Sequence, residues 1–235
     1  MSKKTAIQRI INKDMKEIQN MKLNDLGIFI DFNENNILQA KSIIIGPKNT
    51  PYENGVLYFD IQFPLNYPYS PPIIKYYSRS TYRIHPNLYV GKSCDNFLGK
   101  VCLSILNTWS GPKWTTIMHI GSILITLQSI LTNNPLRNEP GYEGDNTTKN
   151  SIYNLIVEHD TIENLIIRNC FDIPSTYAMF TNEIINHMNK NKKDVISKNQ
   201  DLLLKNPSIK HISFNIYHFK IKIDFKSLIN SLLNT

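Results

Sequence analysis

Four prolines, Pro64, Pro68, Pro71 and Pro72, crowd one short connection in the first third of this 235-residue chain. A proline fixes its φ angle and has no backbone N–H to donate, so residues 64–72 must form a stiff link. The segments on both sides of this link are rich in β-branched and aromatic residues and are bounded by Gly, Pro or Asn. This composition therefore predicts that they form short strands.

Four such segments follow one another, and their sequences are GIFIDFNENN, ILQAKSIIIGP, NGVLYFDIQFP and PPIIKYYS. Pro51 and Gly55 mark the turn before the third of them. Because short links join the segments in chain order, we expect a four-stranded antiparallel meander.

Apolar residues recur at spacings of three and four on both sides of the strands. This period predicts helices over residues 4–22, 115–131 and 147–170, the last ended by Pro174. The order of one helix, several strands, a loop and further helices indicates an α+β fold with helices segregated from one sheet.

The C-terminal part of the chain has weaker patterns. Residues 175–190 look helical, whereas the lysine- and asparagine-rich residues 190–199 predict a linker or an exposed turn. The segment HISFNIYHFKIKIDF alternates like a strand, and its apolar phase shifts near Tyr217, which predicts a bulge or turn there. The closing FKSLINSLL predicts a short helix.

Composition narrows the class of protein. Three irregularly spaced cysteines, Cys94, Cys102 and Cys170, argue against a disulfide framework and against a zinc site built from cysteine alone. No apolar run approaches the ~20 residues of a membrane span, and the start lacks a signal-peptide core. We therefore expect an intracellular protein, without a metal or a membrane anchor. The net charge of +7 leaves nucleic acid, an acidic protein partner or simple solubility open.

Residues 81–114 have no clear period and hold a His-Pro-Asn tripeptide, two cysteines and both tryptophans. A long irregular stretch inside a compact domain is usually functional or disordered.

With these pieces in view, the run from Ser42 to Glu143 resembles the ubiquitin-conjugating enzyme family. The matching pieces, in the family's order, are IIIGP with PYENGVLYFDIQFP, YPYSPP, HPN, GKVCLSIL, a Trp before an apolar helix, and NNP…NEP. GKVCLSILNTWSGPKW and NEPGYE look closer to the larger members, which have a C-terminal extension. The resemblance implies the ubiquitin-conjugating fold, with a catalytic core over residues 1–170 and an extension over residues 171–235.

The resemblance also implies a reaction. The chain would accept ubiquitin or a ubiquitin-like modifier from an activating enzyme as a thioester, then pass it to a lysine amine or to a ligase. It would be a cytoplasmic, ATP-binding, nucleotide-binding transferase, with the nucleus as a further location and with no cofactor.

Within GKVCLSIL the family's nucleophile falls on Cys102, a role that requires an accessible sulfur. The alternative is a small buried hydrophobe between Val101 and Leu103, a common fate of a free cysteine. Cys94 also follows a Gly-Lys pair, but it lacks the Leu-x-Ile-Leu continuation.

The resemblance assigns further site residues. Asn87 would stabilise the oxyanion or brace the nearby loop, while His85 and Pro86 would be structural. Fifteen positions separate Asn87 from Cys102, against about eight in the family, although long surface insertions cost little entropy. Glu139, ahead of Pro140, would orient the acceptor amine; the alternative is a solvated loop glutamate.

Docking residues follow from the same resemblance. The basic first helix would meet an acidic region of the activating enzyme, through Lys3, Lys4, Arg9, Lys13 and Lys16. Ligases would grip Pro68, Tyr69 and the turn after Trp114. Thr115-Thr116-Ile117 replaces the family's Ser-Pro-Ala in that turn.

Two other classes of protein remain as alternatives. One is a catalytically inactive ubiquitin-conjugating-like module that only binds a partner. The other is a nucleic-acid-binding domain, suggested by the pI of about 9.2 and the cluster Lys190–Lys193. No nucleic-acid-binding signature accompanies that cluster, so this class is disfavoured.

Overall fold

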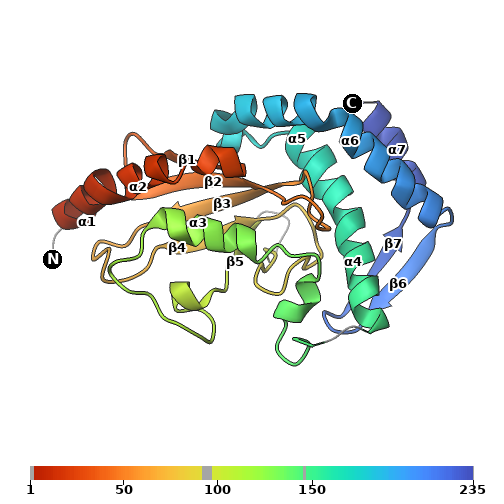
Figure 1. Cartoon of the computed structure of the whole chain (residues 1–235), viewed down its shortest axis with the longest axis horizontal. Helices are drawn as coiled ribbons and strands as arrows, with labels where there is room; N and C mark the ends of the chain where they lie inside the picture. Colours follow the sequence, from red (N-terminus) through yellow and green to blue (C-terminus); the bar gives the residue numbers. More distant parts are fainter. Residues whose placement is uncertain (1–2, 92–96, 145–146, 235) are drawn as a thin grey trace. The chain divides into compact units, whose positions relative to one another are not determined.

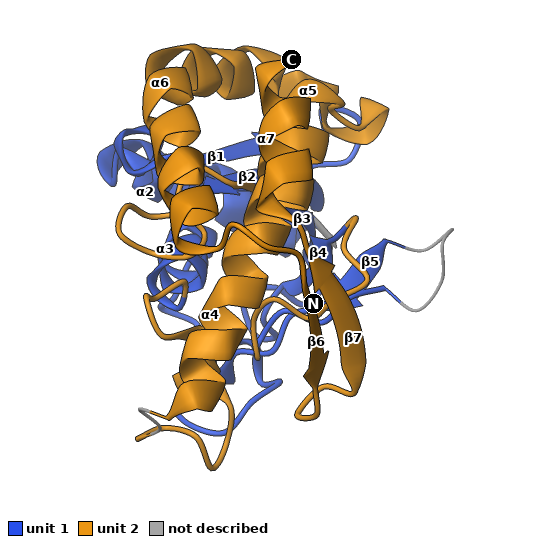
Figure 2. Ribbon diagram, turned by 90° about the vertical axis from the view of Figure 1, so that its right-hand side faces the viewer, with its two compact units in different colours: residues 1–45, 57–78, 87–130 blue, residues 46–56, 79–86, 131–235 orange. Residues whose placement is uncertain are grey.

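The computed structural model describes the chain apart from residues 1–2, 92–96, 145–146 and 235 (Figure 1). It contains two compact units (Figure 2). Unit 1 comprises residues 1–45, 57–78 and 87–130, and unit 2 comprises residues 46–56, 79–86 and 131–235. The boundary that we place at residue 170 is thus not a boundary between these units, because the last part of the expected core groups with the extension.

Unit 1 is built on a five-stranded sheet in the order β1-β2-β3-β4-β5. Its strands are β1 (Ile28–Phe32), β2 (Gln39–Ile45), β3 (Val56–Gln62), β4 (Ile73–Tyr77) and β5 (Leu98–Lys100). The pairs β1–β2, β3–β4 and β4–β5 are antiparallel. The expected meander is confirmed, but the count of four strands is wrong. A three-residue strand is too short to show a period of two.

Helical segments accompany this sheet. They are α1 (Lys3–Arg9), a π-helical turn (Ile10–Asp14), α2 (Met15–Asn20), short 3₁₀ turns (Leu23–Leu26 and Ser104–Leu106) and α3 (Ile120–Ser129). The expected N-terminal helix is confirmed, with the π-helical turn inside it. Helix α3 packs against β2 and α2. It begins later than its apolar period suggests, because His119 is extended and its side chain accepts the Ser122 N–H as a cap.

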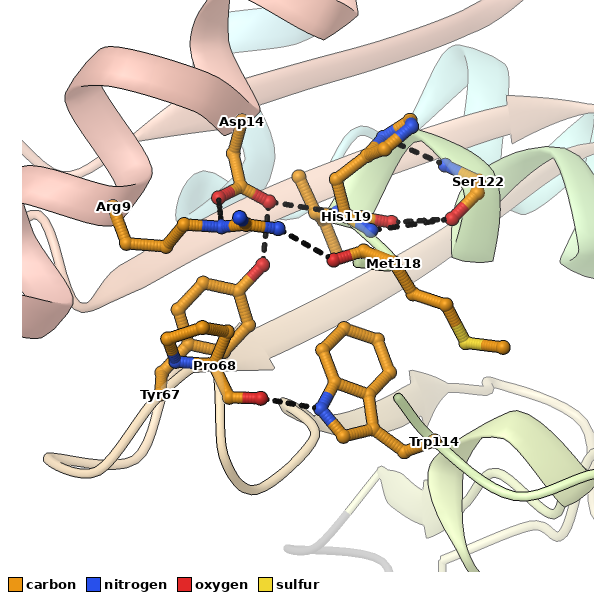
Figure 3. Close-up of polar contacts among 9 residues, drawn as sticks. Arg9, Asp14, Tyr67, Pro68, Trp114, Met118, His119 and Ser122 are labelled. Carbon is orange, nitrogen blue, oxygen red and sulfur yellow. Dashed lines mark hydrogen bonds and ion pairs between the residues drawn. The ribbon is translucent and has the colours of Figure 1, made fainter. Parts of the chain in front are cut away.

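A buried carboxylate joins three parts of unit 1 (Figure 3). Asp14 is fully buried and accepts the Tyr67 hydroxyl and the Ile120 N–H, the latter at 2.9 Å. Its other oxygen lies 3.3 Å from the Arg9 Nε, and the Arg9 Nη2 donates to the Met118 carbonyl at 2.7 Å. The carboxylate thereby ties the first helix to the proline-rich connection and to the start of α3.

Unit 2 holds the remaining helices and a hairpin. Its elements are a 3₁₀ turn (Pro135–Asn138), α4 (Thr148–Asp160), a π-helical segment (Thr161–Arg168), α5 (Asn169–Phe171), a 3₁₀ segment (Ser175–Phe180), α6 (Thr181–Lys205), β6 (Lys210–Phe214), β7 (Phe219–Ile223) and α7 (Phe225–Leu233). Strands β6 and β7 pair antiparallel, and β7 contacts α4 (Figure 2). The expected strand segment, turn and final helix are therefore confirmed.

The interpretation of residues 190–199 as a linker is wrong, because α6 runs through them without a break. The buried apolar residues of α6 are Ile184, Met188, Val195 and Leu202. The last three follow one another at intervals of seven positions, and the residues between them are mostly polar, with lysine and asparagine the most frequent. This spacing keeps one narrow apolar seam on the helix but leaves its local composition polar.

We predict that Asp14→Ala destabilises the protein by about 3 kcal/mol or more, since it leaves Arg9 and the Tyr67 hydroxyl without their buried partner. Urea unfolding measures the change. The exposed neighbour Lys16 provides the control, and Lys16→Ala should stay within about 0.5 kcal/mol of the parent protein. Equal stability of the two variants would contradict the linking role of Asp14.

Candidate active site

Two hydrogen bonds hold the His-Pro-Asn segment against the segment that contains Cys102. The Cys102 N–H donates to the Asn87 carbonyl at 2.9 Å, and the Asn87 Nδ2 donates to the Cys102 carbonyl at 2.7 Å. A β-bridge between Leu88 and Val101 continues the pairing. Asn87 therefore reaches the backbone of Cys102, although the two residues are fifteen positions apart in the sequence.

Cys102 directly follows β5 and the bridge residue Val101, and it is only 3% exposed. The expectation of an accessible sulfur is therefore wrong for this conformation. A buried thiol cannot meet a protein-sized thioester until the side chains around it move. Thioester exchange at Cys102 would require such an opening.

Asn87 is itself buried, and its amide nitrogen is directed at a backbone carbonyl. Of its two expected roles, bracing the loop is the one that this contact performs. A buried hydrogen bond of this kind contributes about 1 kcal/mol and, more importantly, fixes the backbone that carries the sulfur.

His85 and Pro86 belong to unit 2 and are buried. The His85 ring centroid lies 6.0 Å from that of Tyr52, and the Pro86 carbonyl accepts a hydrogen bond from the Arg83 guanidinium. These contacts fit the structural role expected for both residues.

Glu139, also in unit 2, follows the 3₁₀ turn Pro135–Asn138. Its Oε2 accepts the Tyr217 hydroxyl at 2.7 Å and lies 3.8 Å from the Arg83 Nη2. The Arg83 guanidinium also stacks on the Tyr217 ring, 4.8 Å from its centroid. Burial and the neighbouring carboxylate of Glu139 raise the pKa of Tyr217, so its hydroxyl stays a donor. Glu139 is thus held by partners and is not the freely solvated alternative.

Sequence reasoning missed Arg83 and Tyr217 as residues of this cluster. The phase shift near Tyr217 predicts the hairpin turn, but it carries no information about which distant residue the turn contacts. The turn itself is confirmed, with His218 at a φ of 53°.

The other cysteines differ from Cys102. Cys94 lies outside the described residues. Cys170 is buried in unit 2, where burial raises the pKa of its thiol well above the ordinary range. Its Sγ lies 3.4 Å from the Leu165 carbonyl. A thiol with so high a pKa yields little thiolate, so Cys170 suits a structural role.

The basic first helix is only partly available for docking. Lys4 and Lys16 are exposed and Lys13 is half-buried. The side chain of Lys3 lies outside the described residues. The guanidinium of Arg9 is used internally, on Asp14 and on the Met118 carbonyl, so Arg9 contributes less charge to this surface than the exposed lysines.

The expected ligase residues come together in unit 1. The Trp114 Nε1 donates to the Pro68 carbonyl at 2.6 Å, which joins the proline-rich connection to the turn after Trp114 (Figure 3). Tyr69 follows Pro68 in the sequence and is 56% exposed. Ile117 lies three residues after Trp114 and is 75% exposed. Exposed apolar side chains on two joined loops offer a small docking surface.

The model of the family described as "Ubiquitin-conjugating enzyme" matches residues 10–154, more than half of the chain. The chain belongs to the ubiquitin-conjugating enzyme family. This confirms the resemblance drawn from the motifs, and the α+β fold agrees with it.

Named relatives agree with this family. Over 139 residues, 58% of this chain, it is 39% identical to "Ubiquitin-conjugating enzyme E2 Z" of Xenopus tropicalis and covers 42% of that protein. Its identity to the Homo sapiens protein of the same name is 40% over 139 residues, or 58% of this chain and 37% of that protein. "Probable ubiquitin-conjugating enzyme E2 25" of Arabidopsis thaliana is 38% identical over 156 residues, 60% of this chain and 22% of the relative. The chain therefore spans less than half the length of these relatives.

The described residues contain no helix long and apolar enough to cross a membrane. They also contain no group of three or more His, Cys, Asp or Glu side chains placed to hold a metal ion.

We predict that Cys102 of the native protein reacts with iodoacetamide faster than Cys170, because a thiol that exchanges thioesters would have to open locally, whereas Cys170 has a raised pKa. Peptide mass spectrometry after timed labelling measures both rates in one sample. Equal, unfolding-limited rates would show that Cys102 is a core residue.

Proposed function

We propose that this chain accepts ubiquitin or a ubiquitin-like modifier from an activating enzyme as a thioester on Cys102, and passes it to a lysine amine or to a ligase. The observation that carries the proposal is the pairing of Cys102 with Asn87, because it brings the family's two central motifs into one place. Membership of the family supports the same reading.

The chemistry is two acyl transfers. In the first, the Cys102 thiolate attacks the carbonyl carbon of the activating enzyme's thioester, a new C–S bond forms, the old C–S bond breaks, and the activating enzyme's cysteine leaves as a thiolate. In the second, a neutral amine attacks the same carbon, the Cys102 thiolate leaves, and the amine loses a proton. Sulfur suits both steps because a thiolate attacks acyl groups well and leaves well.

Each attack produces a tetrahedral oxyanion. An amide donor aimed at that oxygen lowers the barrier by about 3 kcal/mol. The Asn87 Nδ2 carries two N–H donors, and one of them is used on the Cys102 carbonyl, so the oxyanion contact requires the second to be aimed at the thioester oxygen. We therefore propose bracing as its primary role and assign the oxyanion contact to the loaded state.

Glu139 would receive the acceptor amine. A carboxylate raises the pKa of a nearby lysine and so does not favour its deprotonation; its contribution is to orient the amine. Tyr217 and Arg83 would fix the direction of that carboxylate through the contacts described above.

Partners follow from the surfaces of unit 1. Lys4, Lys13 and Lys16 would meet the activating enzyme, while Pro68, Tyr69 and the turn after Trp114 would meet a ligase. A reactive free cysteine persists in a reducing compartment, so we expect the protein to act in the cytoplasm or nucleus.

The second candidate is an inactive module that binds ubiquitin or a partner. The burial of Cys102 is the one observation on its side, since a sealed thiol cannot be loaded, whereas the family match and the relatives named as conjugating enzymes favour the first candidate. The two candidates differ in whether a covalent adduct forms.

We predict a band shift when the chain is incubated with activating enzyme, ubiquitin and ATP. Thiol reductant should remove the shift, and Cys102→Ala should abolish it. Cys102→Ser should give an adduct that resists reductant, because an oxygen ester does not exchange with thiols. Cys94→Ala and Cys170→Ala serve as controls and should load normally. Loading that persists in the Cys102→Ala variant would contradict the proposal.

We predict that Tyr217→Phe slows discharge to free lysine about tenfold, the equivalent of ~1.4 kcal/mol, while loading of Cys102 is unchanged. The change removes only the hydroxyl that holds Glu139. Tyr82→Phe is the matched control, since it removes a hydroxyl that donates to the Lys220 carbonyl on β7. If both variants discharge at the parent rate, Tyr217 does not position Glu139 for the reaction.

A further inference from the structure

The edge of the sheet in unit 1 is hollowed where the pairing of β4 with β5 ends. Strand β5 pairs with Lys75–Tyr77 only, so Ile73 and Ile74 continue past the last paired residue. At this point lies an open cavity of about 350 Å³. Its lining is largely apolar and includes Pro72, Ile73, Val101 and Leu106.

Two lysines stand at this cavity, one on each strand. Lys75 and Lys100 are direct partners across the β4–β5 ladder, and both are exposed. Like charges directly opposite each other on neighbouring strands are destabilising. Their repulsion is relieved when an anion binds between them.

Among the described residues, no carboxylate pairs with either lysine. Asp60 is the partner of Lys75 across β3 and β4, but its carboxylate is bound by the Lys41 Nζ at 2.6 Å. Lys100 lies on β5, the edge strand of the sheet, where a lysine also discourages unwanted strand pairing. That role accounts neither for Lys75, which lies on the interior strand β4, nor for the apolar cavity beside the two lysines.

We propose that this edge groove, formed by Ile73, Lys75, Lys100, Val101 and Leu106, binds an extended acidic segment of the protein that accepts the modifier. An apolar side chain of the segment enters the cavity, and flanking carboxylates bind the two lysines. The inference rests on the proposed function, since it names the class of acceptor for the thioester on Cys102.

The position of the groove supports an acceptor as its occupant. Lys100 precedes Cys102 by two residues, so the chain separates them by no more than about 7 Å. A segment bound in the groove keeps its own neighbouring lysine close to the thioester, which raises the effective concentration of the amine. A nucleic acid would satisfy the lysines but would leave the apolar lining uncovered, so a protein segment fits better.

Binding is tested on the full chain without ubiquitin, by fluorescence polarisation. The probe is the fluorescein-labelled peptide Glu-Leu-Glu-Val-Lys-Gly. Its comparators are Gln-Leu-Gln-Val-Lys-Gly, which lacks the charge, and Glu-Ser-Glu-Ser-Lys-Gly, which lacks the apolar side chains. We expect each comparator to bind at least about tenfold more weakly than the probe. We also expect added salt to lower the affinity for the probe.

Variants locate the site. The double change Lys75→Glu with Lys100→Glu should lower the affinity for the probe at least about tenfold, and Ile73→Ser should lower it severalfold. Lys22→Glu changes the charge of another exposed lysine of unit 1 and should leave the affinity unaltered. Binding that is insensitive to the double change, or a single-stranded DNA oligonucleotide that binds tighter than the probe at the same edge, would overturn the proposal.

A second readout separates this inference from the proposed function. Discharge of loaded Cys102 to the lysine of the probe should be faster than to the neutral comparator, and the double variant should lose this preference while it still loads. If Cys102 never loads, the proposed function fails whatever the polarisation shows. If it loads but the probe does not bind, the edge groove alone is refuted.

Discussion

The reciprocal contact between Asn87 and Cys102 is the interaction on which the candidate site depends. One backbone bond and one side-chain bond fix the segment after β5 to the segment after His85-Pro86. Neither residue lies in a long helix or strand that could hold it in place. Without these bonds the sulfur would sit on an irregular loop, where small displacements cost large factors in rate.

Unit 2 supplies a comparable constraint for Glu139. The Tyr217 hydroxyl and the Arg83 guanidinium meet on one carboxylate, although Tyr217 stands 78 positions further along the chain. The β6–β7 hairpin therefore does more than cover helix α4. It places a donor that selects one orientation of a carboxylate that would otherwise rotate freely in a loop. The expected extension thus fixes the orientation of Glu139 within unit 2.

The sequence predicts those parts of the fold whose signals are local. The first helix and the β6–β7 turn are confirmed because apolar periodicity over a few residues is enough to specify them. Strand β5 is missed because three residues show no period, and residues 190–199 are misjudged because their buried side chains are seven positions apart. The contacts of Arg9 and Tyr217 depend on residues far away in sequence, so no local pattern reveals them.

The burial of Cys102 bears on how such a site could work. The two hydrogen bonds to Asn87 engage the backbone of Cys102. The side chains that cover the sulfur can therefore move while the main chain stays in place. Local openings of this kind require far less free energy than global unfolding. A thiol that is covered between reactions is also protected from oxidation, since oxidation follows exposure and thiolate character. A closed resting state and a reactive loaded state are therefore compatible in one sequence, provided that the partner protein favours the open form.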